Sequence, residues 1–122
     1  MGRDKATLTI AGRAMATWVA EAMRRSGIEH VVALGGSDAV ELPVVPDLAV
    51  GPACGPLAML IGALDRCGDL LICPCDVPAV PSTLFERLLH AADISKRSVV
   101  LASSDQLEPL IGVYRASALP LL

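Results

Sequence analysis

The most informative segment of this chain reads Leu71-Ile72-Cys73-Pro74-Cys75-Asp76-Val77-Pro78. It opens as an apolar run of the length of one buried strand, and Pro78 ends the pattern two residues after a single carboxylate. In α/β folds, ligands bind beyond the carboxyl ends of the strands, which is where this spacing puts Asp76. A carboxylate there is a hard oxygen ligand that suits Mg²⁺. An Asp that caps the next helix or opens a turn fits the same segment equally well.

Strand and helix patterns alternate along the rest of the chain. Strand-like runs lie at 6–10, 30–34, 42–45, 98–102 and 110–114. Apolar residues at helical spacing indicate helices over 15–23, 56–67 and 83–92, with Thr83 and Glu86 as a capping box, and 116–122 reads as the start of another helix. Strands separated by helices of about 10 to 15 residues indicate crossover connections. The sequence therefore predicts an α/β domain with a doubly wound, mostly parallel sheet.

Composition limits the class of protein. The 122 residues suit one domain, and 53% of them are apolar although only three are aromatic, so Ala, Leu, Val and Ile must fill the core. A net charge of -3 and the lack of clustered Lys and Arg argue against nucleic acid as a partner. The longest apolar stretch, 57–75, is interrupted by charged residues, so no membrane span is expected. We expect a soluble, cytoplasmic protein.

The four cysteines are Cys54, Cys67, Cys73 and Cys75. A zinc site usually shows C-x-x-C pairs or accompanying His, whereas here the one close pair is C-x-C within an apolar run. Buried structural cysteines are the preferred interpretation over a metal site.

Three polar features are expected at one edge of such a sheet: the N-terminal Gly2-Arg3-Asp4-Lys5, the Pro46-Asp47 pair with the loop 51–56 after it, and Asp76. The helix after Pro56 offers free N–H groups and a positive dipole end to an anion. Each feature also has a plainer explanation, because a lone lysine is usually solvated and a Gly/Pro loop is often only a connector.

These residues resemble the molybdenum cofactor guanylyltransferases of the MobA-like NTP transferase family. The resemblance runs along nearly the whole chain, and the C-P-C-D-x-P and M-G-x-D-K stretches, in that order and spacing, are specific together. The matching motifs are Met1-Gly2-Arg3-Asp4-Lys5, Val45-Pro46-Asp47, Gly55-Pro56-Leu57-Ala58, Cys73-Pro74-Cys75-Asp76-Val77-Pro78, Glu108-Pro109-Leu110 and Gly112-Val113-Tyr114-Arg115.

The resemblance implies a Rossmann-like nucleotidyltransferase fold and a Mg²⁺-dependent enzyme. Members of the family join GTP to molybdenum-molybdopterin, which gives a guanine dinucleotide cofactor and pyrophosphate. Lys5 would contact the phosphates of GTP as a catalytic residue, and Asp47 would help to bind the nucleotide. Asp76 would hold Mg²⁺, contact the nucleotide and serve as the second catalytic residue. Transient contact with molybdoenzymes or other cofactor-synthesis proteins follows from the same role.

The family pattern also contains a strand and a glycine-rich loop, L-A-G-G-x-S-x-R, directly before the M-G-x-D-K stretch, which here opens the sequence. By this comparison residues 1–122 form a single, incomplete domain that lacks its first strand and a C-terminal section. Either the start is an internal Met of a longer protein, or the chain is an inactive remnant that acts at most as a binding protein. The first explanation is preferred, because the downstream motifs keep residues suited to chemistry.

Two other functions stay open. The nearest rival is a nucleotidyltransferase that uses CTP or a sugar phosphate. The Gly55-Pro56-Leu57-Ala58 and C-P-C-D-x-P stretches favour the guanylyl branch, although one sequence does not prove the choice of base. A signalling receiver domain is also doubly wound and of similar length, but it needs an acidic pair after its first strand and a lysine after its last. Here the lysine comes first, so that interpretation is poor.

Overall fold

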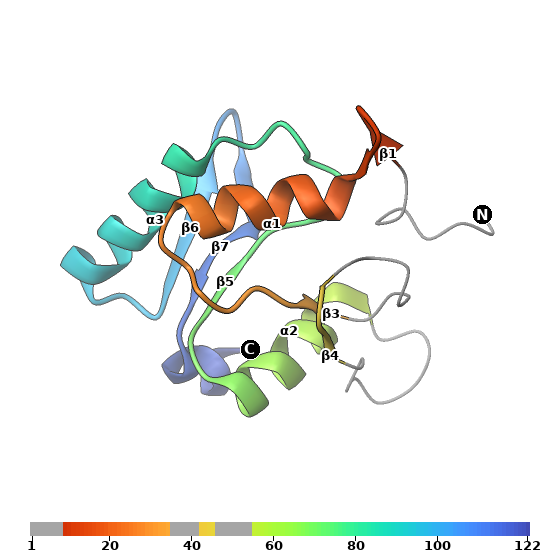
Figure 1. Cartoon of the computed structure of the whole chain (residues 1–122). Helices are drawn as coiled ribbons and strands as arrows, with labels where there is room; N and C mark the ends of the chain where they lie inside the picture. Colours follow the sequence, from red (N-terminus) through yellow and green to blue (C-terminus); the bar gives the residue numbers. More distant parts are fainter. Residues whose placement is uncertain (1–8, 35–41, 46–54) are drawn as a thin grey trace. The chain divides into compact units, whose positions relative to one another are not determined.

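The computed structural model describes residues 9–34, 42–45 and 55–122. Contacts divide the chain into two compact units, one of residues 1–46 with 73–86 and the other of residues 47–72 with 87–122. The helix α3, Ser82–Ser95, begins in the first unit and ends in the second. Figure 1 shows the order of the elements along the chain.

The first unit begins with a short hairpin that leads directly into a helix. Strand β1, Thr9–Ile10, pairs antiparallel with β2, Arg13–Ala14, and both turn residues between them have positive φ. Two-residue hairpin turns of this kind suit the twist of the flanking strands. Helix α1, Met15–Arg25, follows without a break. The prediction of a helix over 15–23 is thus confirmed, whereas only the last two residues of the run 6–10 are described as strand.

Helix α1 ends at a glycine, as its sequence predicts. The N–H of Gly27 donates to the carbonyl of Arg24, and the N–H of Ile28 donates to the carbonyl of Met23. Gly27 has φ +103°, in the left-handed region that such a helix end requires. Arg24 and Arg25 lie in the last turn, where cations interact favourably with the helix dipole.

The rest of the first unit contains one pair of parallel strands. Strand β3, Ala33–Leu34, pairs with β4, Val44–Val45, so only part of each run predicted at 30–34 and 42–45 is strand. The unit resumes at residue 73 with a turn-rich segment, in which the N–H of Val80 donates to the carbonyl of Val77 at 3.1 Å.

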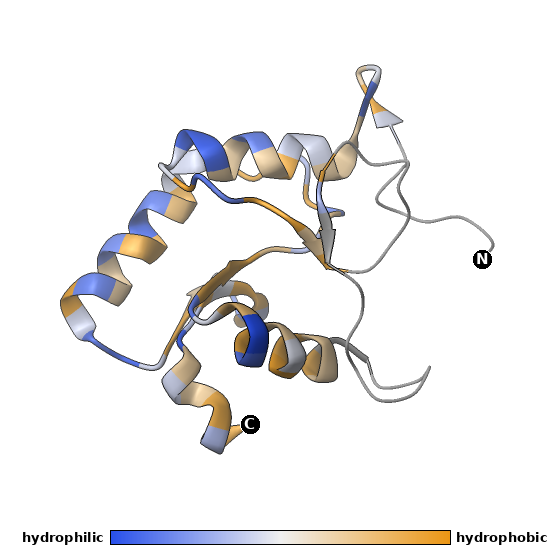
Figure 2. Cartoon of the chain, turned by 60° about the horizontal axis from the view of Figure 1, so that its bottom comes forward, coloured by the Kyte–Doolittle hydropathy of each residue, from blue (hydrophilic) through white to orange (hydrophobic). Residues whose placement is uncertain are grey.

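The second unit is a helix packed on an antiparallel sheet. Helix α2, Gly55–Cys67, is followed by strand β5, Leu70–Ile72. Strands β6, Val99–Ser103, and β7, Leu107–Tyr114, come later in the chain. In the sheet, β7 lies in the centre, between β5 and β6. Most of α2 is hydrophobic in Figure 2. The chain of this unit ends in a 3₁₀ helix, η2, Ala116–Leu121. A hydrophobic core joins α2, all three strands and η2. Its buried residues are Leu60, Leu64 and Tyr114, and the partly buried residues packed against them are Leu70, Ile72, Val99, Leu101 and Leu119.

A bulge interrupts the pairing of β7 with β6. Leu101 pairs with Gly112, but the next residue, Ala102, pairs with Glu108, so the three residues between are left out of the ladder. One of them is Pro109, which has no N–H to donate and is typical of bulges. The hydroxyl of Tyr114 donates to the carbonyl of Pro109 at 2.6 Å, which ties the bulge to the end of β7.

Several expectations from the sequence are corrected by these elements. The mixed α/β class is confirmed, but the mostly parallel order is not: among the described strands only β3 and β4 pair in parallel. Helix α3 begins at Ser82, so Thr83 lies within its first turn and not at the capping position. The C-terminal segment forms a 3₁₀ helix, in which Pro120 cannot donate an α-helical hydrogen bond.

The part of the chain that the structure describes contains no helix that is long and apolar enough to cross a membrane.

Candidate functional site

Asp76 lies in a turn, four residues after the end of β5 along the chain. The strand stops at Ile72, short of the predicted run, and Pro74 and Pro78 keep the segment between them out of regular structure. The Asp76 side chain is exposed and has no hydrogen bond or ion pair with any other residue that the structure describes. Among the described residues, nothing shields this carboxylate from solvent.

The other two predicted site residues, Lys5 and Asp47, lie outside the described residues. Their contacts with GTP, and their closeness to Asp76, stay predictions. The loop 51–56 is described only from Gly55, where α2 begins. The helix start is thus consistent with the prediction of a helix led by Pro56.

The described residues do not by themselves form a metal site. Within the ranges 9–34, 42–45 and 55–122 no group of three or more His, Cys, Asp or Glu could hold an ion by itself. Mg²⁺ commonly takes only one or two protein carboxylates and keeps water and substrate phosphates as its other ligands. A single exposed carboxylate at Asp76 fits that kind of binding and not a closed protein cage.

Cys73 lies three residues before Asp76. Cys73 is half-buried, and this burial, with smaller contributions from the charges of Asp76 and Cys75, raises the pKa of its thiol to about 12. A thiol with so high a pKa is almost entirely protonated at neutral pH and is therefore a poor nucleophile. The expectation of buried cysteines is wrong for Cys67, which is exposed at the end of α2. Cys54 lies outside the described residues.

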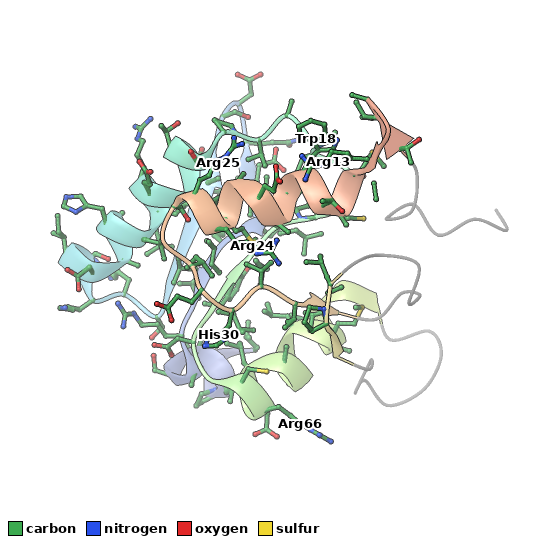
Figure 3. The ribbon with its side chains drawn as sticks, in the orientation of Figure 1. Arg13, Trp18, Arg24, Arg25, His30 and Arg66 are labelled. Atoms are coloured by element: carbon green, nitrogen blue, oxygen red, sulfur yellow. The ribbon has the colours of Figure 1, made fainter. Side chains whose placement is uncertain are left out.

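A cluster that the sequence analysis missed joins the N-terminal hairpin to α1. The guanidinium of Arg13 donates two hydrogen bonds to the carboxylate of Glu21, at 2.9 and 2.5 Å, and lies 4.7 Å from the centre of the Trp18 ring. Nε1 of Trp18 donates to the carbonyl of Ile10 at 2.9 Å. Figure 3 shows Arg13, from β2, beside Trp18, from α1. We call Arg13, Trp18 and Glu21 the Arg13 clamp.

The clamp is an ion pair in which each partner stabilises the charge of the other. The hydrogen bond to Arg13 lowers the pKa of Glu21, and the hydrogen bond to Glu21 raises the pKa of Arg13. Arg25 also approaches Glu21, but only at 3.9 Å and with 74% of its side chain exposed. No sequence signal marks the pair, because Arg13 precedes the helix in β2 and its contact with Glu21, eight residues later, depends on how the strand enters α1.

A second cluster holds the C-terminal 3₁₀ helix in the second unit. Nε of Arg115 donates to the carbonyl of Arg97 at 3.0 Å, and Nη2 donates to the carbonyl of Ala92 at 2.8 Å. The carboxylate of Asp69 accepts from the N–H of Ala116 at 2.8 Å and lies 3.8 Å from Nη1 of Arg115. These contacts fix the start of η2 in the second unit.

The chain is similar in sequence to several proteins that share one name. Proteins called molybdenum cofactor guanylyltransferase from Cereibacter sphaeroides and Rhizobium meliloti are 34% and 31% identical to the chain, each over 93% of it. A probable enzyme of that name from Opitutus terrae is 31% identical over 98% of the chain. The alignments cover 61%, 57% and 62% of those proteins, so the chain spans about three fifths of their length.

Solved structures agree with the sequence comparison at the level of the fold. Molybdopterin-guanine dinucleotide biosynthesis protein A from Archaeoglobus fulgidus aligns with a TM-score of 0.76 at 22% identity, covering 98% of this chain and 63% of that one. A protein of Mycobacterium tuberculosis aligns with a TM-score of 0.67 at 15% identity. The MobA-like NTP transferase domain matches all of residues 1–122. The chain therefore belongs to the MobA-like NTP transferase family.

Proposed function

We propose that this chain provides the nucleotide-handling part of a molybdenum cofactor guanylyltransferase, which transfers GMP from GTP to molybdenum-molybdopterin. The observation that carries the proposal is the identity of 31–34% to proteins of that name, extending over at least 93% of the chain. The open carboxylate of Asp76, in the turn that follows β5, supports it. By this proposal the protein is a nucleotide-binding transferase of molybdenum cofactor biosynthesis.

In the proposed reaction, a terminal phosphate oxygen of molybdopterin attacks the α-phosphorus of GTP. A new P–O bond forms, the bond between the α-phosphorus and the bridging oxygen to the β-phosphorus breaks, and pyrophosphate leaves with the bonding electrons. Negative charge builds up on the non-bridging and leaving oxygens. Catalysis then depends mainly on holding GTP and molybdopterin in the correct relative position and on stabilising this negative charge.

Three side chains divide this work. Lys5 would place its ammonium group against the phosphates, Asp47 would orient the nucleotide, and Asp76 would hold the Mg²⁺ that GTP brings. When bound, Mg²⁺ supplies a positive charge that neutralises the phosphate oxygens. The exposure of Asp76 suits this role, because a ligand must reach the carboxylate from solvent.

The test is a transfer assay on the whole chain with GTP labelled at the α-phosphate, Mg²⁺ and molybdenum-molybdopterin. We expect label in the dinucleotide product and release of pyrophosphate. Asp76→Asn should abolish most of the product, whereas the matched control Asp105→Asn, at an exposed position in the β6–β7 connection, should not change it. Label transfer by Asp76→Asn equal to wild type would refute the assigned role of Asp76.

Competition distinguishes the proposal from the alternatives. Unlabelled GTP should compete for the nucleotide site and CTP should not. Stronger competition by CTP would indicate a different nucleotidyltransferase. Binding of GTP without release of pyrophosphate would indicate a binding protein without transferase activity.

A further inference from the structure

One edge of the sheet in the second unit is a strand without the usual protection of edge strands. Strand β6 pairs with β7 on one side, and no described strand pairs with its other side. Its sequence, Val99-Val100-Leu101-Ala102-Ser103, contains no charged residue, proline or glycine. Proteins commonly place such residues, or a bulge, in an edge strand to prevent further pairing. The bulge of this sheet lies in β7, so β6 itself has no inserted residue.

Every second residue of β6 directs its backbone groups away from β7. The N–H of Arg115, the residue after β7, donates to the carbonyl of Ser98 at 2.8 Å, so Ser98 faces inward. Because these groups alternate along an antiparallel pair, those of Val99, Leu101 and Ser103 point to the outer edge. Three N–H donors and three carbonyl acceptors therefore face outward from β6.

The charges that flank β6 are symmetric about Leu101. Arg97 lies four residues before Leu101 and Asp105 four residues after it, and both side chains are exposed. Within the described part of the chain neither forms an ion pair. If two copies of β6 pair antiparallel with Leu101 opposite Leu101, then Arg97 of one copy comes beside Asp105 of the other at both ends. A shift of the register by two residues separates these charges by about 7 Å.

Apolar surface also stays open along this edge. Val99 and Leu101 pack against the core of the unit, but each is only half-buried. Pairing places Leu101 of one copy against Leu101 of the other, which covers apolar surface that the single chain leaves in water. Main-chain hydrogen bonds then supply the affinity, and the charges at the two ends set the register.

We propose that the outer edge of β6 is an interaction surface for a second copy of this chain, which adds its own β6 antiparallel and so forms a two-fold symmetric dimer. The two sheets then become one, with the order β5–β7–β6–β6–β7–β5. Such a dimer uses the same patch on both copies, so no β6 edge is left for further growth. None of these residues belongs to the proposed nucleotide site, so the dimer and the transfer of GMP are tested independently.

The first measurement is sedimentation equilibrium of the whole chain from about 1 μM to 1 mM. We expect the mass to rise from 12.7 kDa towards twice that value. Ser103→Pro should keep the chain at the mass of one copy, because it removes an outward N–H that β7 does not use. Ser103→Ala keeps that N–H and is the matched control, which should behave like wild type. Circular dichroism establishes that each variant is folded.

Reversal of charge tests the register and does not depend on the proline variant. Arg97→Asp places like charges together at both ends of the paired strands, so we expect the Kd of the dimer to rise about tenfold. Combining Arg97→Asp with Asp105→Arg brings opposite charges together again and should restore the wild-type Kd. A general loss of stability would not be repaired by the second substitution.

Amide exchange followed by NMR tests the pairing residue by residue. In concentrated solution the amides of Val99, Leu101 and Ser103 should exchange more slowly than in dilute solution, whereas that of Val100, which faces β7, should not change. A single copy at every concentration, dimerisation of Ser103→Pro as in wild type, or a double reversal that stays as weak as Arg97→Asp would overturn the proposal. Masses beyond two copies would also overturn it, because they indicate open assembly and not a closed pair.

Discussion

Gly112 is the position where a single added carbon should destabilise the protein most sharply. It lies in the central strand β7, opposite Leu101 of β6 and Ile72 of β5. A Cβ built there would lie 2.8 Å from Cδ2 of Leu101 and 3.1 Å from its Cα, and closer still to the carbonyl oxygen of Val100. The leucine methyl group can rotate away. The Val100 oxygen cannot, because it belongs to a backbone paired with β7.

The expected cost follows from these contacts. Overpacking that forces backbone to move costs about 3 kcal/mol, and the reduced freedom of the unfolded chain offsets at most about 1 kcal/mol for a Gly→Ala change. We therefore expect Gly112→Ala to lower the free energy of unfolding by about 2 kcal/mol or more. For a chain of this length that is a fall in Tm of about 8 °C.

The assay is thermal unfolding of the whole chain followed by circular dichroism. Gly68→Ala is the control, since a Cβ at Gly68 would meet nothing within 4 Å although φ is +82°. It should cost about 1 kcal/mol through backbone strain alone. A Tm for Gly112→Ala within about 2 °C of wild type would refute the reasoning, because it would mean that β6 can move away from β7 freely.

Three further predictions concern other parts of the chain. Asp76→Asn should lower the rate of GMP transfer by about 10²–10³-fold at saturating Mg²⁺ while leaving the Tm unchanged, because the carboxylate is exposed; a normal rate would contradict the metal role. At pH 8.5 iodoacetamide should label the exposed Cys67 well before Cys73, whose pKa of about 12 keeps it a neutral thiol until strongly alkaline pH, as peptide mass spectrometry would show. Arg115→Ala should lower the free energy of unfolding by about 1 to 2 kcal/mol in urea titrations through loss of its bonds to the carbonyls of Arg97 and Ala92, and an unchanged midpoint would count against that account.

The sequence predicts helices well where periodicity and end signals agree. In α1 the spacing of Val19, Ala22 and Met23 places them on the buried face, and Gly27 ends the helix through its left-handed conformation. The same spacing in α2 is correct for Leu60 and Leu64 but wrong for Leu57, which is 54% exposed in the first turn. Periodicity reports a face of a helix, and it does not report how far along the helix that face is covered.

Strand order was the weaker part of the prediction. The runs 98–102 and 110–114 are separated by only seven residues, which is too short for the crossover that parallel strands need. That gap already indicates a hairpin, and the structure has β6 and β7 antiparallel. The bulge could also be anticipated at Pro109, because a proline in a central strand cannot complete the ladder.

The sequence predicts which residues of the candidate site are chemically suited to binding, but it predicts where they lie only in part. The exposed turn at Asp76 agrees with an acid open to a ligand, although the strand before it ends earlier than the apolar run suggests. Lys5 and Asp47 lie outside the described residues, so their roles stay predictions. The Arg13 clamp was not predictable, since the contact of Arg13 with Glu21 depends on how β2 enters α1, which no sequence pattern marks.

The bulge at Pro109 has a practical consequence for protein engineering. Beyond Leu101 and Gly112 the ladder restarts in a new register, and the two strands are joined by the exposed residues 104–106. Pairing at the tip is thus uncoupled from the pairing that buries Val113 and Tyr114 in the core. An affinity tag or fluorescent label inserted between Ser104 and Gln106 would lengthen a surface loop at little entropic cost and would leave the packed part of the sheet in register.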